Sequence, residues 1–246
     1  DGSEPAYAAR RAAARTQAGE PGQPIAEPAR WHTGLGEIGY GVRSVLACMP
    51  WIRTIHIVTD GQMPPVDPEL VRQGRVRIVD HGEIIPARYR PVFASTVIES
   101  FLHRIPGLSD IYLYNNDDFM HGSPIPASVF RQAGADGSPV LRLRTVPALV
   151  RAMIRLASDC APPFLPQANP YTSGIANAAR LCRRRLGLAW PGIVFPRHVT
   201  QVYRVATARR LESLLADELH AARQRRFRGP EQVSWSTLAY SAECHW

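Results

Sequence analysis

The sequence predicts a mixed α/β fold in which a mostly parallel sheet is covered by helices and is followed by a helical C-terminal part. β-Branched runs alternate with helical patterns in the first half of the chain, which is typical of parallel strands joined by crossover helices. After His121 helical spacing dominates. The chain has 246 residues, 45% hydrophobic and 20% charged, which excludes disorder, collagen and coiled coil as its main character.

The first predicted strand follows two helical segments. Residues 1–30 are rich in Ala, Arg, Pro and Gly, and we expect a surface segment with a short helix over Ala6–Thr16. From Glu37 to Met49 apolar side chains recur at helical spacing. Arg53–Thr59 is then a β-branched run, so it predicts a buried strand that ends in the turn Asp60-Gly61.

Two further strands complete the predicted sheet. Arg75–Val79 is a short strand pattern. Thr96 and Glu99 have the spacing of a capping box, which predicts that a helix begins there, and Gly107 is expected to end it. Ile111–Tyr114 predicts a third strand that leads directly into Asn115-Asn116-Asp117-Asp118.

The C-terminal half predicts three longer helices. Thr145 is expected to cap the first, which carries Arg151 and Arg155 on one face and an apolar stripe on another. That stripe consists of Leu149, Val150, Met153, Ile154 and Ala157. Helices over Ser173–Leu186 and Val205–Ala222 follow.

The excess of basic residues indicates which classes of binding partner suit the protein. The net charge is +8, and all 29 basic residues are Arg, whose planar fork suits phosphate and carboxylate groups. Phosphorylated ligands, nucleic acid and an anionic membrane face all fit this excess, and so does an Arg-biased genome. The Arg residues are spread over several elements without a nucleic-acid-binding signature, so we expect no nucleic-acid partner.

Other features of the sequence bear on the cellular compartment of the protein and on whether the chain is a fragment. The four Cys form no CxxC pair, which argues against a zinc ribbon and favours a reducing compartment. No run approaches the roughly 18 apolar residues of a membrane span. The chain begins with Asp1 rather than Met, so we expect a fragment or a processed piece, with its first strand missing.

A GxGxxG pattern at Gly34, Gly36 and Gly39 opens a predicted helix, with Asp60 about 20 residues further on. A dinucleotide site needs a strand directly before these glycines. The preceding PIAEPARWHT is rich in Pro and polar residues, which disfavours that interpretation.

Asn116-Asp117-Asp118 follows a hydrophobic strand, where ligands of open α/β sheets collect. Two adjacent carboxylates there can bind a divalent cation, which in turn can bridge the phosphates of a nucleotide. An Asp-rich turn explains the same residues equally well. Asp60, at the end of another predicted strand, tilts the balance slightly toward a site.

A histidine and an Arg-rich segment form the third candidate. His198 can accept a proton from a hydroxyl near neutral pH, and the guanidinium groups of 223–228 can hold phosphoryl oxygens. A surface histidine and a charged helix end are the alternatives.

Taken together, these segments closely resemble the second conserved region of the Stealth family. Glu37-Ile38 and Val42-Arg43-Ser44 match the start of that region, and Ile57–Pro64 matches its Asp-Gly-Gln turn. Phe93–Ile105 and the strand into Asn116-Asp117-Asp118 match the remainder. Asp1–Pro5 resembles the end of the first region, and His198 with Arg226–Glu231 resembles the third.

The Stealth family includes bacterial capsular polysaccharide phosphotransferases and the N-acetylglucosamine-1-phosphotransferase that marks lysosomal enzymes. The resemblance implies a Rossmann-like or glycosyltransferase-A-like sheet, with residues 1–125 as the nucleotide-sugar-binding core. Residues 126–246 would complete the active site, as one continuous domain with that core. The implied reaction moves a sugar-1-phosphate from a nucleotide diphosphate sugar to a hydroxyl of a glycan acceptor, in capsular or cell-surface polysaccharide synthesis.

The resemblance also implies roles for particular residues. Asp117 and Asp118 would hold Mg²⁺ or Mn²⁺ on the diphosphate, His198 would be the base, and Arg228 would act on the phosphoryl group. The donor would be bound by Asp1, Arg43, Asp60, Gly61, Gln62 and Asn116. Gln232 departs from the family, which commonly has Asp there.

Two other functions stay open at this point. A metal-dependent glycosyltransferase would release nucleoside diphosphate, and a non-catalytic module would bind an anionic glycan through its Arg residues. We expect a cytoplasmic protein, and leave open whether it associates peripherally with the inner face of the membrane. The sequence carries no signal for the oligomeric state.

Overall fold

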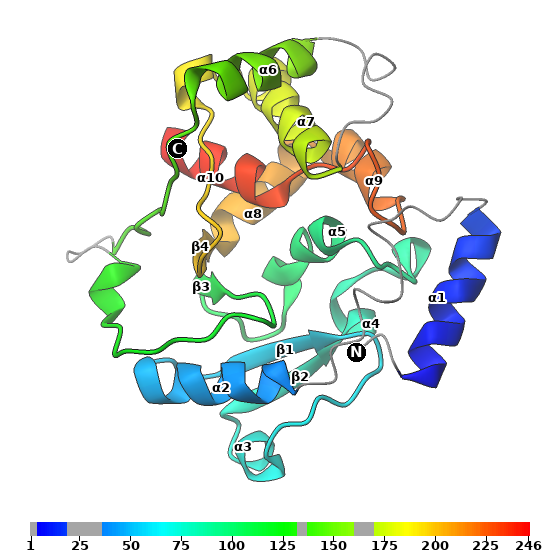
Figure 1. Cartoon of the computed structure of the whole chain (residues 1–246), viewed down its shortest axis with the longest axis vertical. Coiled ribbons are helices and arrows are strands. Elements are labelled where there is room, and N and C mark those ends of the chain that lie inside the picture. Colours follow the sequence, from blue (N-terminus) through cyan, green and yellow to red (C-terminus); the bar gives the residue numbers. More distant parts are fainter. Residues whose placement is uncertain (1–3, 19–35, 132–136, 160–169) are drawn as a thin grey trace. The chain divides into compact units, whose positions relative to one another are not determined.

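The structure, a computed structural model, describes residues 4–18, 36–131, 137–159 and 170–246 (Figure 1). The chain divides into two compact units. Unit 1 comprises 1–91 and 114–140, and unit 2 comprises 92–113 and 141–246. We describe each unit by itself. The division at 125/126, predicted from the sequence, stays a prediction.

The elements follow one another as a mixture of helices and short strands. Residues 4–91 contain α1 (Pro5–Ala18), α2 (Glu37–Cys48), β1 (Ile55–Thr59), α3 (Pro68–Arg72), β2 (Val76–Asp80) and α4 (His81–Ile84). Residues 92–159 contain α5 (Ser95–Glu99), β3 (Ile111–Tyr114) and α6 (Ala148–Asp159). Residues 170–246 contain α7 (Pro170–Arg185), β4 (Gln201–Arg204), α8 (Val205–Leu214), α9 (Ala216–Arg223) and α10 (Trp235–His245).

The mixed α/β class is confirmed, and the sheets are small. In the described ranges, β1 pairs with β2 and β3 pairs with β4, each as a sheet of two strands. The β1–β2 pair is parallel, as predicted, with Ile55 opposite Val76 and Thr59 opposite Asp80. A Rossmann-like or glycosyltransferase-A-like sheet stays a prediction.

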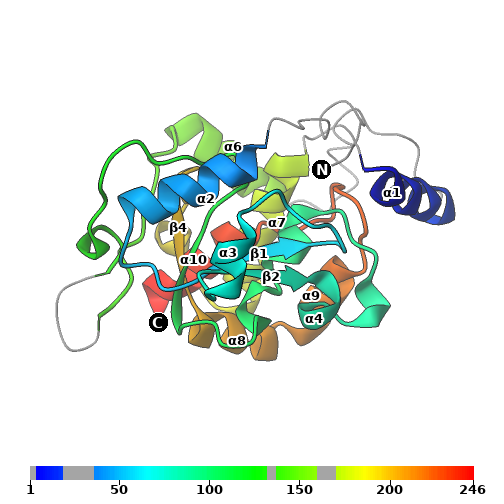
Figure 2. The same ribbon diagram turned by 90° about the horizontal axis from the view of Figure 1, so that it is seen from below.

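The core of unit 1 lies between α2 and the β1–β2 sheet (Figure 2). Val42 of α2 packs against Ile57 of β1 and Val76 of β2, and all three side chains are buried. Leu46 and Leu70 cover the edge of this cluster. The helical spacing from residue 37 onward therefore predicted the correct helix and its inward face.

The capping box is at a different place from the one predicted. The helix α5 begins at Ser95, without a side-chain cap, and Thr96 lies inside it. The Thr96 hydroxyl instead donates to Oε1 of Gln232, at 3.4 Å. The observed capping box joins Asp80 and Glu83 at the start of α4, directly after β2. The Thr96 prediction was wrong because a tertiary partner occupies that hydroxyl.

The long helix predicted over Val205–Ala222 is two helices. Leu215 ends α8 and precedes α9 with a non-helical backbone, φ −120° and ψ 33°. Leu211, Leu215 and Leu219 are all buried on both sides of this break. Apolar spacing of four residues is satisfied by two consecutive helices as well as by one, so the pattern could not reveal the interruption.

The core of unit 2 is built around α10, which packs against α7 and α8 (Figure 1). Trp235, Leu238 and Tyr240 of α10 are almost fully buried. The backbone N–H of Val202 in β4 donates to the Tyr240 hydroxyl at 3.0 Å. Burial raises the pKa of Tyr240 to about 12, so this hydroxyl stays protonated.

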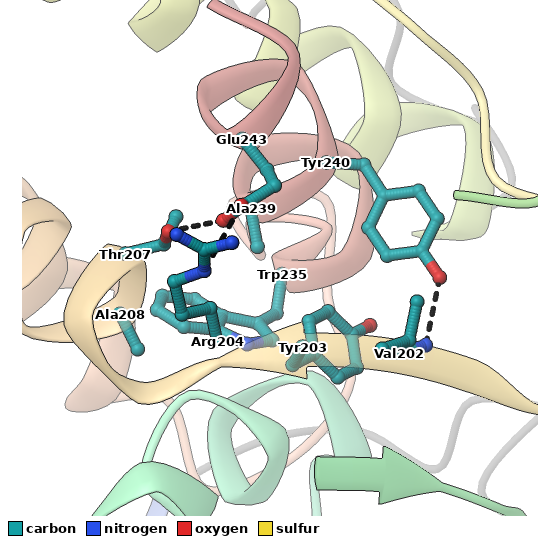
Figure 3. Close-up of a pocket in the computed structure, with 9 residues that line it drawn as sticks. All are labelled: Val202, Tyr203, Arg204, Thr207, Ala208, Trp235, Ala239, Tyr240 and Glu243. Atoms are coloured by element: carbon teal, nitrogen blue, oxygen red, sulfur yellow. Dashed lines mark hydrogen bonds and ion pairs between the residues drawn. The ribbon is translucent and has the colours of Figure 1, made fainter. Parts of the chain in front are cut away.

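A small pocket between β4, α8 and α10 is closed by polar side chains (Figure 3). Glu243 accepts a hydrogen bond from the Thr207 hydroxyl. Its other carboxylate oxygen pairs with Nε of Arg204 at 3.3 Å. Because Glu243 is paired with both neighbours, we interpret the pocket as part of the packing of unit 2.

Candidate active site

The Asp60-Gly61-Gln62 turn lies at the carboxyl end of β1, next to the end of β2. The backbone N–H of Gly61 donates to Oδ2 of Asp80 at 2.7 Å, and Gly61 has φ +73°. A side chain would be strained at this φ, so the turn requires glycine. Ligands of parallel α/β sheets bind at this end of the strands, where Asp60 and Gln62 lie.

The N-terminal segment contacts this turn. Nε2 of Gln62 donates to a carboxylate oxygen of Glu4 at 2.5 Å. Arg10 of α1 pairs with Oδ2 of Asp60 at 3.4 Å and donates to the Asp60 carbonyl at 2.5 Å. Asp1, a predicted donor-binding residue, lies outside the described residues. Glu4, in the segment that resembles the first Stealth region, therefore contacts the second region at Gln62, and Arg10 of α1 contacts it at Asp60.

His81 is a residue of this cluster that the sequence analysis missed. Its Nδ1 lies 3.8 Å from Oδ1 of Asp60, and the side chain is buried. Burial lowers the pKa of His81, opposed by the charges of Asp60 and Asp80, so the imidazole is neutral at pH 7. Its position two residues after the predicted strand Arg75–Val79 was the signal that could have identified it.

The Asn-Asp-Asp segment packs along α2. The backbone N–H of His121 donates to Oγ of Ser44 at 3.0 Å, and Sγ of Cys48 donates to the His121 carbonyl at 3.3 Å. The side chains of Asn115 and His121 form a hydrogen bond of 3.1 Å. These contacts fix both ends of the 115–121 loop, so Asp117 lies in a segment anchored to α2.

Three predicted site residues of unit 1 are exposed on these neighbouring segments. Asp117 and Asp118 are exposed, and so is Arg43 of α2. The Arg43 guanidinium lies 4.4 Å from the ring centroid of Tyr40, which is itself 55% exposed. Arg43 is one residue from Ser44, which holds the Asn-Asp-Asp loop. The structure thus brings α2 and the two carboxylates into one region.

The carboxylate pair fits a metal ion that is held partly by substrate, and does not fit a metal ion enclosed by protein side chains. Within the described residues, no group of three His, Cys, Asp or Glu side chains gathers to enclose an ion. Two exposed carboxylates suit Mg²⁺ or Mn²⁺ held by one or two protein ligands, with water and substrate phosphates completing the coordination. Asp117 and Asp118 therefore fit a cation that arrives with a diphosphate.

In unit 2, Arg228 is held by the start of α5. Its Nη2 donates to Oγ of Ser95 at 2.9 Å. The backbone N–H of Phe93 donates to the Arg226 carbonyl at 2.7 Å, and the Phe93 and Phe227 rings stack with centroids 5.1 Å apart. Ser95 orients Arg228, a role that the sequence analysis did not assign, although Ser95 belongs to the matched Phe-x-Ser motif.

His198 is exposed and lies in the segment before β4. It belongs to unit 2 with Arg228, whereas Asp60, Asp117 and Asp118 belong to unit 1. A single site made of all five residues stays a prediction.

Gln232, which departs from the family pattern, is a buried structural residue. Its Nε2 donates to the Pro170 carbonyl at 2.5 Å, and its backbone carbonyl accepts from Nδ2 of Asn177 at 2.9 Å. Only 4% of Gln232 is exposed. An Asp carboxylate could not donate to Pro170, so an amide suits this position.

Comparison with known proteins identifies the region that carries the turn and the carboxylates. Residues 32–137 match the family described as Stealth protein CR2, conserved region 2. The chain belongs to the Stealth family. The matched Stealth region includes Arg43, the Asp60-Gly61-Gln62 turn and Asn116-Asp117-Asp118.

Curated relatives agree with this assignment. A capsular polysaccharide phosphotransferase of Actinobacillus pleuropneumoniae is 44% identical over 102 residues, which are 42% of this chain and 28% of the relative. An exopolysaccharide phosphotransferase of Mycobacterium tuberculosis is 37% identical over 188 residues, which are 76% of this chain and 31% of the relative. The chain thus spans less than a third of the length of these relatives.

Proposed function

We propose that this Stealth protein transfers a sugar-1-phosphate, such as N-acetylglucosamine-1-phosphate, from a nucleotide diphosphate sugar to a hydroxyl of a glycan acceptor. The reaction would serve capsular or cell-surface polysaccharide synthesis. One observation carries the proposal. The region that matches the second conserved region of the Stealth family presents two exposed carboxylates, Asp117 and Asp118, on a loop anchored to the helix that carries Arg43.

In the proposed reaction the acceptor oxygen bonds to the phosphorus that carries the sugar. The bridging P–O bond breaks, and nucleoside monophosphate leaves. His198 accepts the hydroxyl proton, and the guanidinium groups of Arg43 and Arg228 hold phosphoryl oxygens. A bound Mg²⁺ or Mn²⁺ on Asp117 and Asp118 supplies charge neutralisation to the diphosphate. The Rossmann-like or glycosyltransferase-A-like core belongs to this same proposal.

The test is a screen of nucleotide diphosphate sugars with Mg²⁺ or Mn²⁺ and an oligosaccharide acceptor, with analysis of the nucleotide product. We expect nucleoside monophosphate, and at least a 100-fold loss of its formation in Asp117→Asn or Asp118→Asn, because either change removes a ligand charge. EDTA should stop the reaction, and added Mg²⁺ should restore it. The matched control is Asp67→Asn in unit 1, which keeps an effective N-cap for α3.

Other products would support other functions. Nucleoside diphosphate would show a glycosyltransferase that breaks the sugar–phosphate bond instead. Glycan binding that weakens steeply with salt and is unchanged in Asp117→Asn, without any nucleotide turnover, would show a non-catalytic binding module.

The described part of the chain contains no helix long and apolar enough to cross a membrane. We propose a cytoplasmic location for the reaction, where nucleotide sugars are the donors, as the setting of this activity.

A further inference from the structure

The helix α6 exposes most of its large apolar side chains. Leu149 is 74% exposed, Met153 63% and Leu156 67%, and Val150 is 42% exposed. Residues 149, 153 and 156 follow the i, i+4, i+7 spacing that places side chains on one helix face. Exposed apolar side chains are common singly, but a cluster on one helix face indicates an interaction surface.

This exposed face is separate from the one that holds α6 in unit 2. The helix lies across α7 (Figure 1), and Ile154 is buried, with only 3% of its surface exposed. The guanidinium of Arg151 lies 5.8 Å from the ring centroid of Phe195, so this side chain is also turned toward unit 2. The exposed leucines and methionine are therefore additional to the contacts that fix the helix.

Most of the charged residues near this face along the sequence are positive, and Asp159 at the end of α6 is the one acidic residue of the helix. Between Asp136 and Asp159 there is no acidic residue, while Arg142, Arg144, Arg151 and Arg155 lie within that stretch. Arg142, Arg144 and Arg155 are exposed.

An exposed aromatic side chain at the start of α7 contacts one of these arginines. Nη2 of Arg144 donates to the hydroxyl of Tyr171 at 3.4 Å, and Tyr171 is 57% exposed. Tyrosine is typical of the boundary between lipid and water, because its ring is apolar and its hydroxyl is polar.

We infer that α6 is a docking surface for an anionic lipid bilayer, lying in the plane of the membrane with Leu149, Met153 and Leu156 inserted among the lipids. An apolar face with several arginines on and just before its helix is complementary to anionic headgroups in both charge and hydropathy. A helix of 12 residues is too short to span a bilayer, which is consistent with a position at the interface. This inference does not depend on the proposed transferase activity.

The experiment is sedimentation of the chain with vesicles of phosphatidylcholine alone or with 30% phosphatidylglycerol. The apolar variant is Leu149→Gln, Met153→Gln and Leu156→Gln combined, and the charge variant is Arg155→Gln. The control is Met63→Gln, which removes an apolar side chain that is 79% exposed in unit 1. Circular dichroism checks that each variant folds, which is expected because the altered side chains are exposed.

We expect binding to the anionic vesicles to be at least 10-fold tighter than to phosphatidylcholine, and the apolar variant to lose at least 10-fold of it. Arg155→Gln should weaken it several-fold, high salt should weaken it further, and Met63→Gln should leave it unchanged. Binding that the apolar variant retains would overturn the inference, because it would then come from arginines elsewhere. Absence of vesicle binding, or a wild-type dimer that the apolar variant converts to a monomer, would overturn it in favour of a protein partner.

Discussion

Glu212 of α8 is the anion of a buried charge network in unit 2. Its Oε1 accepts from Nη1 of Arg223 at 2.5 Å and from Nη2 of Arg104 at 3.0 Å, and its Oε2 lies 3.1 Å from Nε2 of His103. Arg223 is only 5% exposed and also donates to the Ser100 carbonyl at 2.8 Å. We predict that Glu212→Gln destabilises unit 2, because it leaves the Arg223 cation buried without an anion.

The size of this effect follows from the pKa of Glu212. Burial by itself raises that pKa, but the hydrogen bonds and charges of His103 and Arg223 outweigh it and hold it at about 2, against an ordinary 4.5. Such a lowering on folding corresponds to roughly 3 kcal/mol of stability above pH 5. Because the folded-state pKa is depressed, this stability is lost as pH falls from 4.5 toward 2, and about 1 kcal/mol remains at pH 3.

The assay is urea denaturation at pH 7 and pH 3, followed by tryptophan fluorescence and circular dichroism. Glutamine has the shape of a protonated glutamate, so Glu212→Gln should lower the free energy of unfolding by about 3 kcal/mol at pH 7 and about 1 kcal/mol at pH 3. Glu231→Gln is the control, since its pair with Arg225 is 3.8 Å long and exposed, and it should cost less than about 0.5 kcal/mol. An equal loss for Glu212→Gln at the two pH values would refute the reasoning.

Three further variants test the turn, the buried amide and the Arg228 contact. Gly61→Ala should lower the stability of unit 1 by about 1–2 kcal/mol in urea denaturation, because alanine is strained at φ +73°, and an unchanged midpoint would contradict this. Gln232→Glu should cost about 1–3 kcal/mol at pH 7, since a carboxylate would face the Pro170 carbonyl, and thermal denaturation should show partial recovery at pH 4. Ser95→Ala should raise the KM for the nucleotide sugar several-fold with little change in melting temperature, because it removes a hydrogen bond that orients Arg228; rescue by Ser95→Thr would separate this positioning role from a general packing defect.

Much of the local structure was predictable, because it depends on residues near one another in sequence. The helix α2 and the strands β1, β2 and β3 lie where apolar spacing placed them, within two residues at each end. The helix that Gly107 was expected to end is shorter than predicted, since α5 ends at Glu99, although Gly107 does adopt φ +76°. The break at Leu215 could not be predicted, because the buried leucines keep their spacing across it.

The sequence predicted which residue types make up the candidate site, but only some of the contacts that these residues make. The matched motifs predicted Asp60, Asp117 and Arg228 as candidates, because their chemistry is visible in the sequence. The residues that contact them in the structure could not be identified from the sequence. His81 was missed beside Asp60, and Ser95 was missed beside Arg228.

The sequence by itself determined the family, the parallel β1–β2 pair and the chemical groups of the proposed site. Only the tertiary structure decided which of these side chains are held by hydrogen bonds or ion pairs, and which residues hold them. Ser95 and Arg228 are 133 positions apart in the chain, and Glu4 and Gln62 are 58 apart. It also decided that the apolar face of α6 is exposed rather than buried. The physical reason is that periodicity and spacing report local geometry, whereas contacts between distant segments depend on how the whole chain packs.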